Sequence, residues 1–396
     1  MKRATTTIFL ILALIATTLA VIAFGRGYRF NPGQKNLSST GLLVASSDPT
    51  GAQVWLDGNL KTATNNTLAL SPGWYQVKIT KEGFLSWEKK LRVQGEVVTE
   101  TQTMLFPSTP SLSPLTTSGV IAPVLSPDGT KIVYAIPIKA GLPAEASAKA
   151  GLWVINLNSQ PLGFSRDPLL LAKSSSGLDF AQGTFAWSPD SKQILVSLGA
   201  NRYLLEGEKT STAVPLSWDG WKNLLKDWTI LEKEKEAEKM ILLPPEMAKI
   251  ATESAKIFAF SPDETKLLYQ ATASATLAQF LTPAPIATNS TPEVRTLKPG
   301  ATYIYDLKED KNFEIQKDGA LLSWFPSSRH LIAVESDKIS LMEYDGTNKS
   351  TVYNGPFEKF VGPSPSGGKL LVLTSYNRPI GPQISGMANL YSINLR

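Results

Sequence analysis

Three aspartates are the first candidates for chemistry, because they recur in one local pattern: Asp128, Asp190 and Asp263. Carboxylates that converge in a cleft can act as general acid and base or hold a divalent cation. Each of these aspartates, however, follows a serine and a proline, a pattern that favours a β-turn in which the carboxylate accepts backbone N–H groups. The prolines are Pro127, Pro189 and Pro262. Because equivalent turns lie on separate repeats, we expect structural residues here, with no catalytic or metal site.

The lone histidine, His330, is the second candidate, since Ser327 and Ser328 stand just before it. A Ser–His pair can form an activated nucleophile. The G-x-S-x-G turn of the serine hydrolases is missing from the sequence, however. His330 also occupies a position inside a repeated turn, so we interpret it as a structural residue.

Composition removes most other enzyme classes. The 396 residues include no cysteine and one histidine, which excludes thiolate catalysis, iron–sulfur clusters and multi-histidine metal sites. The stretch from Gly362 to Lys369 lacks the glycine spacing of a phosphate loop, and Leu370 stands where Ser or Thr is required. A net charge of +5 is too mild to indicate nucleic acid. We therefore expect no enzyme, no cofactor and no nucleic-acid partner.

The elements that carry these residues are repeats. A turn pattern followed by an apolar strand recurs five times after residue 119, with starts at Ser126, Ser188, Ser261, Phe325 and Ser364. The last copy keeps its proline, Pro365, but has serine in place of aspartate. Further alternating, aromatic-rich strands follow most copies. One such unit cannot bury its own apolar face, and antiparallel repeats of this size are typical of propeller blades. The sequence predicts five blades, with a degenerate sixth as the alternative.

This pattern closely resembles the PD40 repeats of TolB-like (WD40-like) β-propellers, and the resemblance covers residues 119–396. The Ser- and Pro-rich segment 107–118 is expected to be a linker followed by a closing strand. The chain stops after the third strand of the last blade, and residues 112–117 stand at the offset of a fourth strand before Ser126. We expect this strand to complete the last blade and remove an open sheet edge.

Residues 41–106 show the period-two alternation of β-strands and predict a small β-sandwich. Asp57 and Gly58 are expected to form a tight turn, and Gly73 to adopt a positive φ. The order of motifs resembles the PEGA domain, although Ser-Pro-Gly-Trp replaces its signature tetrapeptide. The resemblance implies a surface module of a prokaryotic envelope protein, without catalytic residues. Three tryptophans are interpreted as core residues rather than as a ligand platform: Trp55, Trp74 and Trp87.

Residues 1–27 predict a cytoplasmic tip and a transmembrane helix. Lys2 and Arg3 precede a run from Ala4 to Gly25 that has no charge and no proline. As a helix this run would be about 33 Å long, the thickness of the hydrocarbon core. A cleaved signal peptide is the alternative.

The charges on the two sides of this helix nearly balance, since Arg26, Arg29 and Lys35 follow it. We place the amino terminus inside because a basic start before an apolar run is how export signals begin. Residues 28–40 are expected to be a polar stalk.

Two insertions interrupt the repeats. Residues 218–255 predict a helix whose apolar side chains recur at helical spacing, followed by a charged run and a break at Pro244-Pro245. These side chains are Trp221, Leu224, Leu225, Trp228 and Leu231. We expect this helix to pack on the side of the propeller, with partner docking as the alternative. Residues 271–300, rich in Ala, Thr and Pro, predict a flexible loop.

Together these features indicate a single-pass protein of the cell membrane with the bulk of the chain outside the cytoplasm. We expect a binding or scaffolding module whose propeller recognises a protein partner, such as another envelope protein. A cell-wall or surface glycan is the alternative ligand. A propeller enzyme is the least favoured class.

Overall fold

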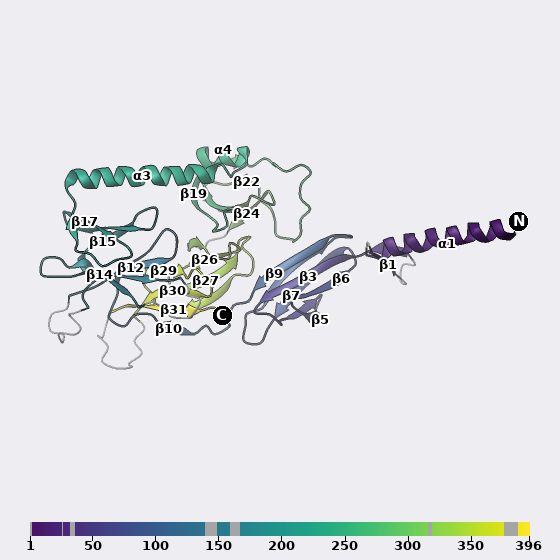
Figure 1. Cartoon of the computed structure of the whole chain (residues 1–396), viewed down its shortest axis with the longest axis horizontal. Helices are drawn as coiled ribbons and strands as arrows, with labels where there is room; N and C mark the ends of the chain where they lie inside the picture. The colour runs from purple at the N-terminus through teal and green to yellow at the C-terminus, as the bar shows by residue number, and fades with distance from the viewer. Residues whose placement is uncertain are drawn as a thin grey trace. The chain divides into compact units, whose positions relative to one another are not determined.

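The structure is a computed structural model that describes residues 2–25, 27–31, 36–138, 149–158, 167–315, 319–375 and 387–396. The chain forms two compact units. One comprises Met1–Ser108 together with Ala284–Pro292, and the other comprises Thr109–Pro283 together with Glu293–Arg396. Figure 1 labels many of the helices and strands of both units.

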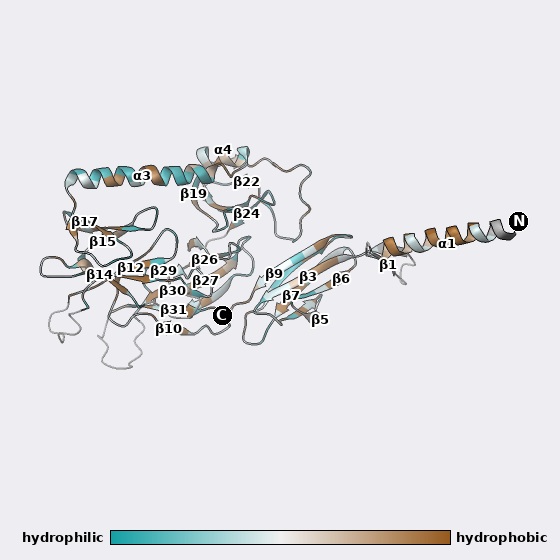
Figure 2. Ribbon diagram, in the orientation of Figure 1, coloured by the Kyte–Doolittle hydropathy of each residue, from teal (hydrophilic) through white to brown (hydrophobic). Residues whose placement is uncertain are grey.

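The first unit begins with α1 (Lys2–Gly25), a helix without acidic residues. Its stretch Thr6–Gly25 has a mean hydropathy of 2.7 and no buried residue, and Figure 2 shows it mostly apolar. A helix of this length and composition can cross a membrane. The strands β1 (Tyr28–Asn31) and β2 (Asn36–Ser39) then pair as an antiparallel hairpin inside the segment expected to be a stalk. Arg26 and Lys35 were counted among the charges on the two sides of the helix, and they lie outside the described residues.

A β-sandwich of two sheets follows, with strand orders β6-β3-β9 and β5-β4-β7-β8. Its strands are β3 (Gly41–Asp48), β4 (Gln53–Leu56), β5 (Asn59–Ala63), β6 (Asn66–Leu70), β7 (Gly73–Thr80), β8 (Trp87–Val93) and β9 (Val98–Met104). Alternate residues point inward and fill one core, which includes Leu43, Val54 and Ile79. The apolar residues that recur at every second position of these strands in the sequence are therefore the residues that are buried.

A segment from the 271–300 insertion joins this sandwich. The backbone N–H of Arg92 donates to the carbonyl oxygen of Thr288 at 2.8 Å, and that of Ser290 donates to the carbonyl oxygen of Lys90 at 3.1 Å. Residues 284–292 thereby cover the outer edge of β8, where the sequence suggested only a flexible loop. The physical reason is that an edge strand offers unpaired N–H and C=O groups that an extended segment can satisfy.

The second unit is a β-propeller, with five four-stranded sheets among the described residues. Blade 1 has β11 (Ile121–Leu125), β12 (Lys131–Ile136), β13 (Gly151–Asn156) and β14 (Leu169–Lys173). Blade 2 has β15 (Thr184–Trp187), β16 (Gln193–Leu198), β17 (Asn201–Glu206) and β18 (Val214–Pro215). Blade 3 has β19 (Ala255–Phe260), β20 (Lys266–Ala271), β23 (Thr302–Asp306) and β24 (Lys311–Ile315). Blade 4 has β25 (Leu321–Trp324), β26 (His330–Val334), β27 (Lys338–Glu343) and β28 (Ser350–Asn354).

Blade 5 closes the ring with a strand from the start of the unit. It contains β29 (Val361–Pro363), β30 (Lys369–Thr374), β31 (Asn389–Asn394) and β10 (Leu112–Pro114). β10 pairs antiparallel with β31, with Leu112 opposite Ile393. The edge of β31 is therefore covered, as a closed ring requires. The all-β class inferred from the sequence, a small sandwich followed by a propeller, is confirmed.

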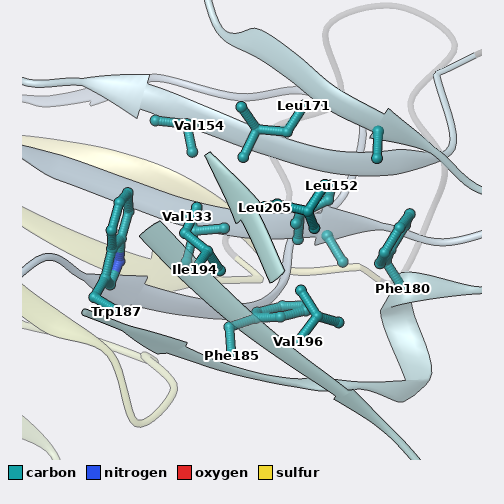
Figure 3. Close-up of a cluster of buried hydrophobic side chains, with 12 residues drawn as sticks. Val133, Leu152, Val154, Leu171, Phe180, Phe185, Trp187, Ile194, Val196 and Leu205 are labelled. Atoms are coloured by element: carbon teal, nitrogen blue, oxygen red, sulfur yellow. The ribbon is translucent and has the colours of Figure 1, made fainter. Parts of the chain in front are cut away.

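Apolar side chains between adjacent blades form the core that holds the ring together. Figure 3 shows Val133, Leu152 and Leu171 of blade 1 against side chains of blade 2, such as Phe185 and Trp187. The indole Nε1 of Trp187 also donates to the carbonyl oxygen of Val124, at 3.1 Å. Trp324 makes the equivalent bond to Ala259, at 3.2 Å, between blades 3 and 4. Each bond joins a strand beside a repeat turn to the preceding blade.

The helical insertion lies between blades 2 and 3. It contains α3 (Trp218–Met240) and α4 (Pro245–Glu253), while the short 3-10 helix η1 (Phe180–Gln182) precedes β15. α4 buries Met247, Ile250 and Ala251 in the core of blade 3. α3 has no buried residue. Three of its apolar side chains, Trp221, Leu224 and Trp228, are nevertheless half-buried, and Met240 packs against the core of blade 3. The expected packing on the side of the propeller is therefore partial, and partner docking stays the alternative.

The shorter insertion carries a small hairpin of its own. β21 (Ala275–Thr276) pairs with β22 (Thr296–Leu297). These two strands belong to the propeller unit, whereas residues 284–292 between them belong to the sandwich unit.

Candidate functional site

The aspartates of the repeat turns bond within their own turns. The hydroxyl of Ser126 donates to Asp128 Oδ1 at 2.5 Å, and the backbone N–H of Thr130 donates to the same oxygen at 3.0 Å. The Ser126 hydroxyl oxygen in turn accepts from the N–H of Lys131, at 2.9 Å. Asp190 and Asp263 repeat this arrangement with Ser188 and Ser261.

These hydrogen bonds shift the acidity of the turn aspartates. Partial burial acts to raise the pKa of Asp128, but the donors Ser126 and Thr130 and the charge of Lys131 outweigh it, and the net pKa is lowered. The pKa of Asp190 is lowered above all by the hydrogen bond from Ser188. An aspartate held in its charged form by its own turn is a poor general acid.

The residue after each turn aspartate takes a left-handed conformation. Gly129 has φ 69°, and Ser191 and Ser328 have φ 61° and 57° at the same place in later repeats. The Ser191 hydroxyl oxygen accepts the N–H of Asp128 in the preceding blade at 3.1 Å, and that of Ser328 accepts the N–H of Asp263 at 3.0 Å. The sequence analysis did not predict these hydrogen bonds between blades. The pattern that could have indicated them is the serine that replaces the expected glycine in every second turn.

The other catalytic candidates also lie within the repeats, with Ser327 in a turn and His330 at the start of β26. Ser327 Oγ lies 3.0 Å from His330 Nδ1, but His330 is buried and packs edge-on against Phe325. The stretch from Gly362 to Lys369 contains the end of β29, the turn with φ 66° at Gly367 and the first residue of β30. Across the described ranges no three His, Asp or Glu side chains are close enough to hold a metal ion.

Asp310 of the second unit holds several hydrogen-bond donors, and no pattern in the sequence singled it out. It is almost fully buried, and its Oδ2 accepts the N–H groups of Phe280 and Leu281 at 2.6 and 2.8 Å. Its Oδ1 accepts the hydroxyl of Tyr305 at 2.8 Å, and Arg295 pairs with it at 3.4 Å. Burial acts to raise its pKa, but these donors outweigh burial and lower the pKa of Asp310. Asp310 therefore anchors the base of the 271–300 insertion.

The exposed face of α3 is the strongest candidate for an interaction surface. We define the α3 stripe as Trp218, Trp221, Leu224, Leu225, Trp228 and Leu231. Trp218 is 64% exposed, and Leu225 and Leu231 are each 37% exposed, whereas Trp221, Leu224 and Trp228 are half-buried. Lys222 lies 5.0 Å over the Trp218 ring, and Arg202 lies 5.6 Å over the Trp221 ring. Polar contacts fix the far end of the helix, where Lys235 Nζ donates to the carbonyl oxygen of Pro189 at 2.7 Å.

The turns of the sandwich differ from expectation at one position. Asp57 and Gly58 have φ values of 49° and 79°, and Asp57 Oδ1 accepts the N–H of Gln76 at 2.9 Å. Gly73 does not take a positive φ. It is the first residue of β7 and pairs with Val93, so it has extended backbone instead.

Comparison with protein families identifies this unit. Residues 40–108 match the PEGA domain family. This segment is a PEGA domain. The match covers well under half of the chain, so it describes the segment and not the whole protein. No curated protein matches the sequence.

Solved structures similar to the chain include propellers of the class that the repeats resemble. A protein assigned as TolB from Agrobacterium tumefaciens is 13% identical over 66% of this chain and 72% of its own, with a TM-score of 0.21. TolB from Acinetobacter baumannii is 11% identical over 81% and 59%, with a TM-score of 0.22. The RRP9 WD40 repeats are 10% identical over 73% and 98%, with a TM-score of 0.28. Such values carry no argument about function.

The tryptophans of the PEGA domain divide between its core and its surface. Trp87 is buried, as expected, but Trp55 is only half-buried and Trp74 is 42% exposed. The expectation that all three are core residues is therefore wrong. Trp55 and Trp74 occupy outward positions of β4 and β7, whose inward positions are filled by Val54, Val77 and Ile79.

Proposed function

We propose that this protein is a membrane-anchored binding module whose propeller unit recognises a protein partner. The observation that carries the proposal is the α3 stripe, in a helix without a single buried residue. A soluble helix normally turns its apolar side chains toward a core. Apolar side chains left exposed on an otherwise charged helix, here Trp218, Leu225 and Leu231, are typical of a contact surface.

The position of α3 supports this role. The helix is fixed near both ends, by Arg202 over Trp221 and by the contacts of Lys235 and of Lys239 with Glu264. A partner therefore meets a surface that is already held in place, which reduces the entropy cost of binding. The partner that fits is a protein with a complementary apolar face, such as another envelope protein.

The role of α1 as an uncleaved anchor is part of the same proposal. Its exposed apolar stretch supports insertion into a membrane, with the amino terminus inside and both folded units outside. The mass of the mature protein, purified from membranes, tests the anchor, because removal of a signal peptide would shorten the chain by about two dozen residues. A reporter fused after Arg396 tests the orientation, and a reporter active only in the cytoplasm would contradict it.

A binding role is also supported by the placement of the polar side chains. The repeat aspartates accept hydrogen bonds within turns on different blades, and His330 is buried at the start of β26 beside Ser327. We propose that the protein is not an enzyme and that these residues, with the prolines before them and Pro365, are structural. We assign the same role to Asp57, Gly58 and Gly73 in the sandwich.

Capture of partners by the full-length protein from native membranes tests the proposal. Leu225→Lys places a charge in the α3 stripe, whereas Glu234→Lys places the same residue about 180° away on the helix. We expect the partner recovered with the wild type and Glu234→Lys to be lost with Leu225→Lys. Equal recovery with both variants would overturn the assignment of α3 as the contact surface.

A further inference from the structure

The outer face of the β5-β4-β7-β8 sheet carries a hollow that the proposed function does not use. It has a volume of about 440 Å³ and lies entirely within the PEGA domain. It is lined by Trp55, Gly58, Gln76, Lys78, Thr80 and Glu88. The register explains the grouping, because Lys78 of β7 stands between Trp55 of β4 and Glu88 of β8.

The indole of Trp55 is held in a fixed orientation. Its Nε1 donates to the hydroxyl of Thr80 at 3.2 Å, while the side chain stays half-exposed. The outward face of a sheet is normally polar. A tryptophan held there by a hydrogen bond therefore offers a flat apolar surface to a ligand. The surface is pre-organised because the hydrogen bond limits rotation of the ring.

The polar side chains around the indole include both donors and acceptors. Gln76 Nε2 donates to Glu88 Oε1 at 2.9 Å, which fixes these two side chains, and the exposed Lys78 lies beside them. The single positive charge of Lys78 is balanced by the single negative charge of Glu88. A charged ligand would gain from one of these groups and be repelled by the other, whereas hydroxyl groups can both donate and accept.

We propose that this hollow binds a neutral saccharide, with one pyranose ring stacked on Trp55 and its hydroxyls bonded to Lys78 and Glu88. A sugar ring has an apolar C–H face, which can stack on the hydrogen-bonded indole of Trp55. It also has hydroxyl groups around its edge, which can bond to the polar side chains next to the indole. A peptide added as a strand would pair along an edge of this sheet, at β5 or β8, whereas Trp55 and Lys78 lie on the inner strands β4 and β7. This site is independent of α3, so the failure of either proposal leaves the other standing.

Saturation-transfer NMR of the full-length protein in detergent tests the site, with two neutral hexasaccharides as probes, one of β-linked glucose and one of β-linked N-acetylglucosamine. We expect transfer to the ring protons of at least one probe. Trp55→Ala should lower the signal at least tenfold. Trp74→Ala is the matched control, because Trp74 is an exposed tryptophan on the same face of β7 that does not line the hollow.

A second variant guards against a folding defect in Trp55→Ala. Lys78→Ala removes an exposed side chain from the same hollow and should weaken binding several-fold while the fold is kept. The absence of transfer to both hexasaccharides from the wild type would overturn the proposal. So would equal loss of signal in Trp74→Ala and Trp55→Ala, or capture of a protein partner through Trp55 in place of a sugar.

Discussion

The propeller and the PEGA domain differ in where they place several of their aromatic side chains. In the propeller, Tyr134, Tyr269 and Tyr303 are fully buried between or within blades, and burial raises the pKa of Tyr269. In the PEGA domain, Trp55 and Trp74 lie on the outer face of a sheet. These buried tyrosines of the repeated strands help to hold the blades together. Binding is therefore expected outside the repeats, on α3 and on the outer PEGA sheet.

The largest expected effect comes from the buried anchor of the propeller. Asp310→Ala leaves two backbone N–H groups and the Tyr305 hydroxyl without their acceptor and removes one of the partners of Arg295. We expect this change to cost about 3 kcal/mol of the unfolding free energy. Asp57→Ala removes one hydrogen bond from an exposed turn of the PEGA domain and should cost about 1 kcal/mol. Denaturant unfolding of the full-length protein measures the loss of unfolding free energy in both variants. Amide hydrogen exchange shows which of the two units is destabilised. Equal losses of unfolding free energy in the two variants would contradict the expected difference between the propeller and the PEGA domain.

Acid should act on the propeller through its aspartates. The pKa values of Asp128, Asp190, Asp263 and Asp310 are lowered by hydrogen bonds and nearby cations. A lowered folded-state pKa gives stability that is present above the unfolded pKa of about 3.9 and is lost as the pH falls through the lower folded value. We expect the denaturation midpoint of the propeller to drop between about pH 4 and pH 2.

A triple variant sharpens this expectation. Asn at positions 128, 190 and 263 keeps the shape of each turn side chain but cannot ionise. Its denaturation midpoint should depend less steeply on pH over the same range. A slope identical to that of the wild type would show that these carboxylates do not contribute to the acid response.

The smallest expected effect concerns the segment shared between the two regions. Ser290→Pro removes the N–H that donates to the carbonyl oxygen of Lys90. We expect a loss of about 1 kcal/mol of PEGA domain stability and faster amide hydrogen exchange at Arg92. Ser290→Ala keeps the N–H and should leave exchange unchanged. If exchange at Arg92 is the same in both variants, residues 284–292 do not stabilise β8.

Local, repeated patterns made much of the fold predictable. Each blade begins with the same turn, so the strands around Ser126, Ser188 and Ser261 could be placed by comparison with one another. The closing strand followed from simple counting, because β31 lacked a partner in sequence order and residues 112–117 stood at the right offset. The Asp57-Gly58 turn was predictable because it depends on only two residues.

The features missed depend on contacts between distant segments. Asp310 is buried because residues 280–281 meet it, 29 and 30 positions earlier in the chain. Alternation places Trp74 on one face of β7 with Gln76, but only the position of the second sheet decides that this face is outward. The apolar spacing of α3 predicts a helix, yet spacing alone cannot distinguish a buried stripe from an exposed one.

Site-specific photo-crosslinking from α3 in native membranes tests the central claim most directly. A photoreactive residue at position 225 lies in the α3 stripe, and one at position 234 lies on the opposite side of the same helix. We predict a discrete adduct of higher mass from position 225 and none from position 234. No adduct at position 225, or the same adduct from both positions, would contradict a partner surface on α3.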